Sequence, residues 1–173
     1  MSDVCFESLA PALGVESSIE FAMASQFGDA HGVIVVTRVQ MCCVEPPMVA
    51  VAIRKGRPIE PIIRDARSFS LSRLDPSDVY TSRKLRTLDE HEEDPLGLIR
   101  TDTIVSGAPC LVRSPAVLDC EVTRHFDLEG DHALYVGEVL AIRTSEVTHV
   151  YREQIEEQDE DASMIAASEF SAA

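Results

Sequence analysis

Apolar and polar residues alternate in short runs along most of the chain, as is typical of strands in a half-buried sheet. The most apolar stretch is 31–53, HGVIVVTRVQMCCVEPPMVAVAI. Alternation through 33–41 gives one fully apolar face and one that turns polar halfway. After Pro46-Pro47, which interrupt strand pairing, 48–53 is apolar on both faces. The pattern predicts two strands, and the second must be covered on both sides by helices or by another copy of the chain.

Further runs predict the rest of the fold. Alternating apolar positions predict strands over 19–25, 68–74, 110–112, 116–123 and 132–142, with 68–74 half-exposed. In 116–123 we expect Leu118, Cys120 and Val122 to face the core and Asp119, Glu121 and Thr123 to face water. Short helices are predicted over 58–66 and from Asp75 to about 86. This order favours a mainly β fold, a closed antiparallel barrel with short flanking helices.

Length and composition predict a single domain. A chain of 173 residues with 45% hydrophobic content can build one core. We expect an N-terminal arm over 1–17, a folded domain over 18–151, and an acidic, flexible tail over 152–173. The tail holds one basic and seven acidic residues.

The charge balance excludes some partners. A formal net charge of −15 argues against binding to nucleic acid, although small anions can still bind at a local site. The sequence predicts no membrane association, because no apolar run is long enough to span a bilayer. The N-terminal residues do not have the pattern of a signal peptide, so we expect a cytoplasmic protein.

Five cysteines are present without a CxxC pair: Cys5, Cys42, Cys43, Cys110 and Cys120. An odd number in a chain predicted to be cytoplasmic favours free, buried thiols, and no metal site is predicted. A cysteine-based redox or metal protein is the less favoured alternative.

Two basic clusters are candidate anion sites. Arg54, Lys55, Gly56 and Arg57 directly precede the predicted helix 58–66, whose N-terminal N–H groups would favour a phosphate. The alternative is a solvated charged turn. The second cluster, 82–86, is followed by acidic residues, which favours surface pairing.

Three motifs occur in order along the chain. They are EPPMVAVAI with KGR behind it (45–57), SGAP (106–109) and GDHALYVGEV (130–139). With their spacing, they resemble the flavin reductase-like family, the FMN-binding split barrel, over about 19–143.

The resemblance implies a homodimeric split barrel that binds FMN, or FAD, at the dimer interface and takes a hydride from NAD(P)H. Carried over to this sequence, His132 would face the nicotinamide as the catalytic residue, although a histidine at a strand start is also often structural. The flavin contacts would fall on Val36, Thr37, Arg38, Cys42, Cys43, Lys55, Gly56, Arg57, Arg83 and Lys84.

The chain departs from the family in one segment. Where the family has small hydroxyl residues near the flavin, 32–37 reads GVIVVT and keeps only Thr37. Each lost hydrogen bond would weaken flavin binding by about tenfold. Two functions follow: a flavin oxidoreductase that passes electrons to flavin or to an unidentified acceptor, or a non-catalytic split-barrel dimer with weakened or lost flavin binding.

Overall fold

The computed structural model describes residues 19–90, 96–97 and 99–151, without the side chains of 87–90. The predicted arm and tail lie outside these residues. The strands are β1 (Phe21–Phe27), β2 (Ala30–Val36), β3 (Val39–Val44), β4 (Pro47–Arg54), β5 (Ser68–Arg73), β6 (Thr101–Asp102), β7 (Cys110–Leu111), β8 (Ala116–Asp127), β9 (His132–Thr144) and β10 (Thr148–Val150). The helices are α2 (Ile59–Ala66) and α3 (Val79–Glu90).

None of the described helices is long and apolar enough to cross a membrane.

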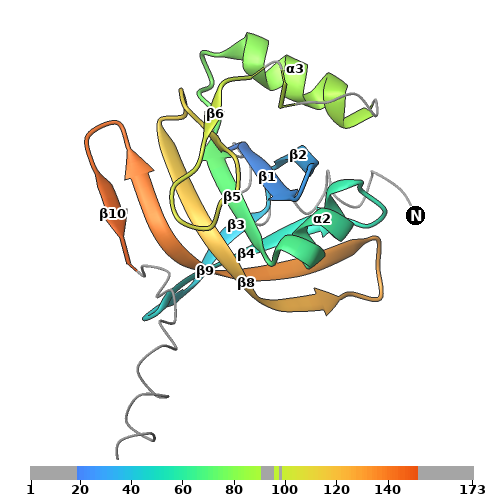
Figure 1. Ribbon diagram of the computed structural model, residues 1–173. Coiled ribbons are helices and arrows are strands. Elements are labelled where there is room, and N and C mark those ends of the chain that lie inside the picture. Colours follow the sequence, from blue (N-terminus) through green and yellow to red (C-terminus); the bar gives the residue numbers. More distant parts are fainter. Residues whose placement is uncertain (1–18, 91–95, 98, 152–173) are drawn as a thin grey trace, which may run out of the picture.

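One antiparallel sheet forms the body of the molecule (Figure 1). Its strand order is β2-β1-β5-β8-β9-β4-β3, β10 pairs with β9, and β6 and β7 form a separate ribbon. The mainly β fold with two short helices is confirmed. The expected closure is wrong, because β2 and β3 stand at opposite ends of the order and do not pair within the described residues.

The stretch 31–44 makes two strands where the alternation predicted one. Thr37 and Arg38 interrupt it, both exposed, so that β2 pairs with β1 and β3 pairs with β4. The amide of Ala52 donates to the Arg38 carbonyl over 3.1 Å, which fixes this link beside β4. The break places the Arg38 side chain at the end of the sheet.

The inner face of the sheet, defined as the face toward the main core, is built from six strands and α2. Alternate residues of β1, β2, β4, β5, β8 and β9 converge there, so the sheet must curve. Ile59 and Ile63 of α2 are fully buried against them, and α2 covers one end of the curved sheet. The main core consists of Met23, Ile34, Val36, Val49, Val51, Ile53, Ile59, Ile63, Phe69, Leu71, Cys120, Ala133, Tyr135 and Val139.

A second, smaller core lies on the other face of β1 and β2, under α3 (Figure 1). Leu85 of α3 packs there against Ala22, Ala24 and Val33. The helix starts later than Asp75, because the Asp78 carboxylate caps it by accepting the Thr81 amide over 3.0 Å. Asp75 instead accepts the amide of Ser77, in the turn before the helix.

Strand β5 is buried on both faces, so the prediction of a half-exposed strand is wrong. Ser68, Ser70 and Ser72 are each less than 7% exposed. The segment 109–111 covers two of them: the Ser70 hydroxyl donates to the Pro109 carbonyl, and the Ser72 hydroxyl accepts the Leu111 amide over 2.9 Å. Ser70 and Ser72 therefore bind backbone, and none of the three serines faces water.

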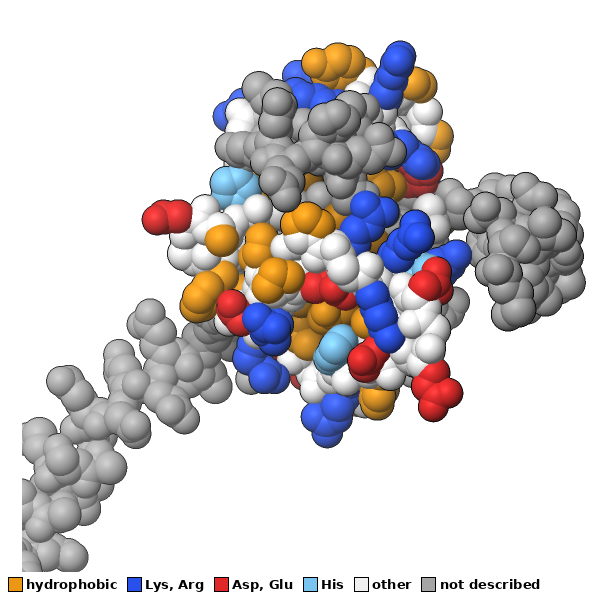
Figure 2. All heavy atoms as spheres, turned by 90° about the vertical axis from the view of Figure 1, so that its right-hand side faces the viewer, with side chains coloured by type: hydrophobic (Ala, Val, Ile, Leu, Met, Phe, Trp, Pro, Cys, Tyr) orange, Lys and Arg blue, Asp and Glu red, His pale blue; other side chains and the backbone are white. Residues whose placement is uncertain are grey.

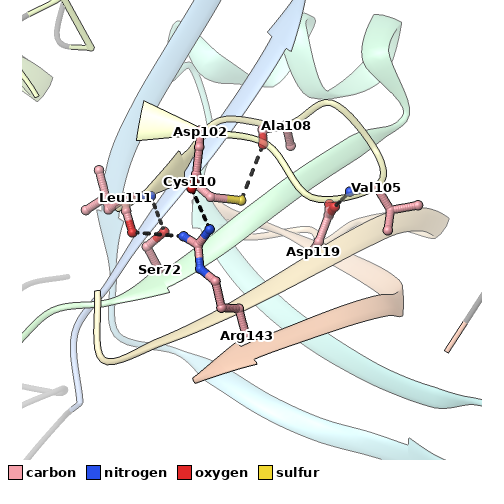
Figure 3. Close-up of polar contacts among 8 residues, drawn as sticks. All are labelled: Ser72, Asp102, Val105, Ala108, Cys110, Leu111, Asp119 and Arg143. Carbon is pink, nitrogen blue, oxygen red and sulfur yellow. Dashed lines mark hydrogen bonds and ion pairs between the residues drawn. The ribbon is translucent and has the colours of Figure 1, made fainter. Parts of the chain in front are cut away.

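Asp119 is also buried, against the expectation that it faces water (Figure 3). Its carboxylate accepts the amide of Val105 over 2.6 Å and the amide of Ser106 over 2.9 Å, and the Ser106 hydroxyl donates to it as well. A bulge between Asp119 and Cys120 shifts the alternation of β8 at this point. The carboxylate thus holds the loop that covers β5.

Gly137 packs directly against Phe69 in the core. A Cβ at this position would lie 2.6 Å from Cζ of Phe69, which is itself fully buried. We expect Gly137→Ala to lower the free energy of unfolding by about 1–3 kcal/mol, because Phe69 has nowhere to move. Urea unfolding measures this, with Gly130→Ala as the control, since a Cβ at Gly130 meets no atom within 4 Å. Equal stability of the two variants would contradict this packing.

Candidate functional site

The candidate site is centred on His132, the first residue of β9. Its Nε2 lies 2.5 Å from Nη1 of Arg38, a contact across 94 residues of sequence, and its Nδ1 lies 2.7 Å from Oδ1 of Asp131. The fold brings the three together because β9 pairs with β4, which puts Arg54 opposite His132, and the Arg38 link lies beside β4 on its other side. Arg38, Asp131 and His132 form the charged cluster of the site.

The contacts fix the roles of the imidazole nitrogens. A guanidinium can only donate, so Nε2 accepts from Arg38 and Nδ1 carries the proton that it donates to Asp131. The hydrogen bond from His132 holds the pKa of the Asp131 carboxyl below its ordinary value, and the positive charge of Arg54 acts in the same direction. The imidazole is thereby oriented from both sides. The sequence motif contained Asp131, but its role as the partner of His132 was not predicted.

An apolar surface leads away from this cluster along the outer face of β4 and β9, the face opposite the main core. Side chains paired across the two strands are Ala52 with Leu134 and Ala50 with Val136, and all four are half-buried. Met48 extends the surface toward β3. In the single chain this surface is only partly covered, whereas the sequence predicts that both faces of the strand over 48–53 are covered, by helices or by another copy of the chain.

The turn 55–57 lies next to the cluster, because the Lys55 amide donates to the Asp131 carbonyl over 2.9 Å. Lys55 Nζ pairs with the Asp127 carboxylate and donates to the Leu128 carbonyl. The Gly56 amide, at φ +80°, donates to Oε2 of Glu60 over 2.8 Å. Two of the predicted anion donors are therefore engaged by carboxylates of the protein itself.

The other predicted flavin contacts are distributed over the fold. Val36 is buried in the main core, while Thr37 is exposed next to Arg38. Cys42 and Cys43 lie at a bulge in β3, where Cys43 is opposite Met48, at the far end of β4 from Arg54. The structure thus brings Thr37, Arg38, the turn 55–57 and His132 to one end of the sheet, and the two cysteines to the other.

Arg83 and Lys84 belong to a different region. They lie on α3, which covers the outer face of β1 and β2, whereas β9 starts at the hairpin with β8 on the far side of the molecule (Figure 1). Nζ of Lys84 lies 5.7 Å from the centroid of the Tyr80 ring. The structure does not bring these two residues to the charged cluster.

The four described cysteines are free, but the prediction of buried thiols is wrong for Cys42, which is exposed, and for Cys43, which is half-buried. Cys110 and Cys120 are buried and are unsuited to thiol chemistry. Burial, together with the charge of Asp119, raises the pKa of Cys110 to about 12, and burial raises that of Cys120 well above its ordinary value. No group of three His, Cys, Asp or Glu side chains among the described residues is arranged to hold a metal ion.

The comparison with family models gives the class of protein to which this fold belongs. Residues 22–154 match the model of the flavin reductase like domain. The chain belongs to the flavin reductase-like family. The resemblance seen in the three sequence motifs is confirmed.

Similar proteins extend the comparison. The chain is 28% identical over 148 residues to "Putative diflavin flavoprotein A 1" of Nostoc sp., covering 82% of this chain but 25% of that protein. The chain thus spans about a quarter of the length of this relative. Among solved structures, it superposes on the NADH:FAD oxidoreductase of Streptomyces globisporus with a TM-score of 0.71, at 18% identity, covering 87% of this chain and 89% of that one. The FMN-binding protein of Thermus thermophilus gives a TM-score of 0.69 at 22% identity, covering 75% and 71%. These two likenesses show the fold.

Proposed function

We propose that the chain is a flavin reductase-like oxidoreductase that binds FMN, or FAD, and transfers a hydride to it from NAD(P)H. The observation that carries the proposal is the charged cluster, in which Arg38 and His132 meet at 2.5 Å where the apolar outer face ends. A flavin has a flat apolar ring system and polar edges that gain negative charge on reduction. An apolar surface that ends in a guanidinium and an imidazole fits such a group.

Each member of the cluster has a role in this proposal. The flavin, when bound, supplies the hydride-accepting chemistry. Arg38 provides a permanent positive charge that stabilises negative charge developing beside it. His132 holds its proton on Nδ1 and orients the guanidinium through Nε2, and it faces the nicotinamide. Asp131 keeps the imidazole in this tautomer.

The site is proposed to be completed by a second copy of the chain. The outer apolar surface of β4 and β9 is half-buried in the single chain, and Met41 and Val44 of β3 are 62% and 76% exposed. Burial of such a surface in a homodimer would stabilise it by about 25 cal/mol per Å². The charged cluster would then lie at the rim of the dimer interface.

The alternative is a split-barrel dimer with weak or no flavin binding. It is favoured by one observation: Val33, Ile34 and Val36 of β2 are buried in the two cores, so they offer a ligand no hydrogen-bonding side chain.

Spectroscopy separates the two functions. The purified protein is titrated with FMN, followed by the quenching of flavin fluorescence, and NADH or NADPH is then added without oxygen. We expect saturable binding and bleaching of the flavin absorbance band. Binding without bleaching would indicate a flavin carrier, and no binding would reject the proposal.

A further inference from the structure

A cleft of about 580 Å³ opens between α2 and the hairpin of β8 and β9. Figure 2 shows this face, where basic side chains surround a hollow with apolar atoms exposed in it. The volume is within the range of small-molecule sites. The cleft is lined by Lys55, Glu60, Ile63, Arg64, Arg67, Val122, Thr123, Arg124, His125, Asp127, Ala133 and Tyr135.

The rim of the cleft is positive in a protein that is strongly negative. Four cationic and two carboxylate side chains line it, a net charge of +2 with His125 neutral, whereas the whole chain carries −15. Arg67 donates to the Val122 carbonyl over 3.3 Å and Arg124 to the Thr123 carbonyl over 3.0 Å. Each of these bonds uses one of the five N–H groups of a guanidinium, and a guanidinium matches the geometry of phosphate.

The floor of the cleft is aromatic and apolar. The rings of His125 and Tyr135 lie with their centroids 4.5 Å apart, and Tyr135 is buried while His125 is exposed. Ile63, Val122 and Ala133 complete the floor. Burial, with Glu60 nearby, raises the pKa of Tyr135, so its hydroxyl keeps its proton. A flat ring can stack on such a floor while its phosphate meets the rim.

The cleft lies on the opposite face of β9 from the charged cluster. Ala133 and Tyr135 point inward to the cleft and the main core, while His132 and Leu134 point to the outer face. Lys55 is the residue that borders both, and its ammonium is turned to Asp127 on the cleft side. A ligand in the cleft therefore does not occupy the flavin position proposed above.

We propose that this cleft binds an anion that carries both a phosphate and a flat ring, the chemistry of a mononucleotide, independently of the flavin. The cationic rim contributes the phosphate contacts through Arg64, Arg67 and Arg124. The exposed ring of His125, which lies against the buried ring of Tyr135, contributes the stacking surface. The site stands whether or not FMN binds at the charged cluster.

Calorimetric titration with adenosine monophosphate (AMP) tests the proposal. The control ligands are adenosine, which lacks the phosphate, and ribose 5-phosphate, which lacks the flat ring. We expect AMP to bind at least tenfold more tightly than either. Arg64→Gln and Arg124→Gln should each weaken AMP binding by about tenfold, since both side chains are exposed and their loss leaves the fold intact. Arg113→Gln, an equal change of charge at an exposed arginine outside the lining, should leave the affinity unchanged.

Three results would overturn the proposal. These are no AMP binding at millimolar concentration, equal affinity in the Arg64, Arg124 and Arg113 variants, and displacement of AMP by saturating FMN. The last result would assign the cleft to the flavin site.

Discussion

Asp119→Ala should lower the free energy of unfolding by about 3 kcal/mol or more, the largest stability effect that the structure predicts. The Asp119 side chain is fully buried and accepts hydrogen bonds from the Val105 amide and from both the amide and the hydroxyl of Ser106. Its removal leaves these three donors without their acceptor. Urea unfolding followed by circular dichroism measures the loss.

The consequence should extend beyond Asp119 itself. The loop it holds also accepts the Ser70 hydroxyl at Pro109 and donates the Leu111 amide to Ser72, so its release uncovers β5. Asp29→Ala, at an exposed turn position, is the control and should change stability by less than about 0.5 kcal/mol. Similar losses in both variants would show that the loop is not anchored at Asp119.

Arg38→Gln should reduce the rate of NADH-dependent flavin reduction, expressed as kcat/KM, by about 100-fold. The substitution removes the permanent positive charge at the proposed flavin edge and leaves Nε2 of His132 without the donor that lies 2.5 Å away. Because Arg38 is exposed, the fold should be unaffected. Steady-state kinetics with FMN and NADH measure the effect, and Arg113→Gln provides an arginine control remote from the cluster.

A double-mutant cycle makes this prediction sharper. If Arg38 and His132 act as one unit, His132→Gln alone should reduce kcat/KM, and the double variant should lose much less than the product of the two single effects. Independent, multiplicative losses would show that the contact has no role in the reaction. Unchanged rates in both single variants would place the chemistry elsewhere.

The local pattern of apolar and polar residues predicted most strands and helices of this fold. The wrong predictions, on the burial of β5 and of Asp119, are explained by tertiary contacts. The hairpin of β1 and β2, the helix α2 and the long strand β9 all follow from alternation and turn residues. Strand β5 has the alternation of a half-exposed strand, yet Ser70 and Ser72 bind a segment that lies more than 30 residues later in the chain. Asp119 was misjudged for the same reason, since nothing near it in sequence indicates that the amides of 105 and 106 require an acceptor.

The site residues that lie within a recognisable sequence motif could be predicted. His132 stands out in the sequence because it lies within GDHALYVGEV, but its contact with Arg38 spans 94 residues and depends on the pairing of β9 with β4. The three arginines of the cleft gave no usable signal, because Arg64 and Arg67 lie on and after one helix and Arg124 on a distant strand. Only the fold, in which α2 packs on β1 and β2 and lies across a cleft from the hairpin of β8 and β9, brings them together.

Sedimentation equilibrium of the full chain with FMN, recorded at the flavin absorbance, tests the central claim most directly. The account predicts that flavin sediments with a species of twice the chain mass of 19.0 kDa, because the apolar outer face of β4 and β9 joins two copies beside the flavin. Flavin that stays with the small-molecule fraction, or protein that sediments at the mass of one chain, would contradict it.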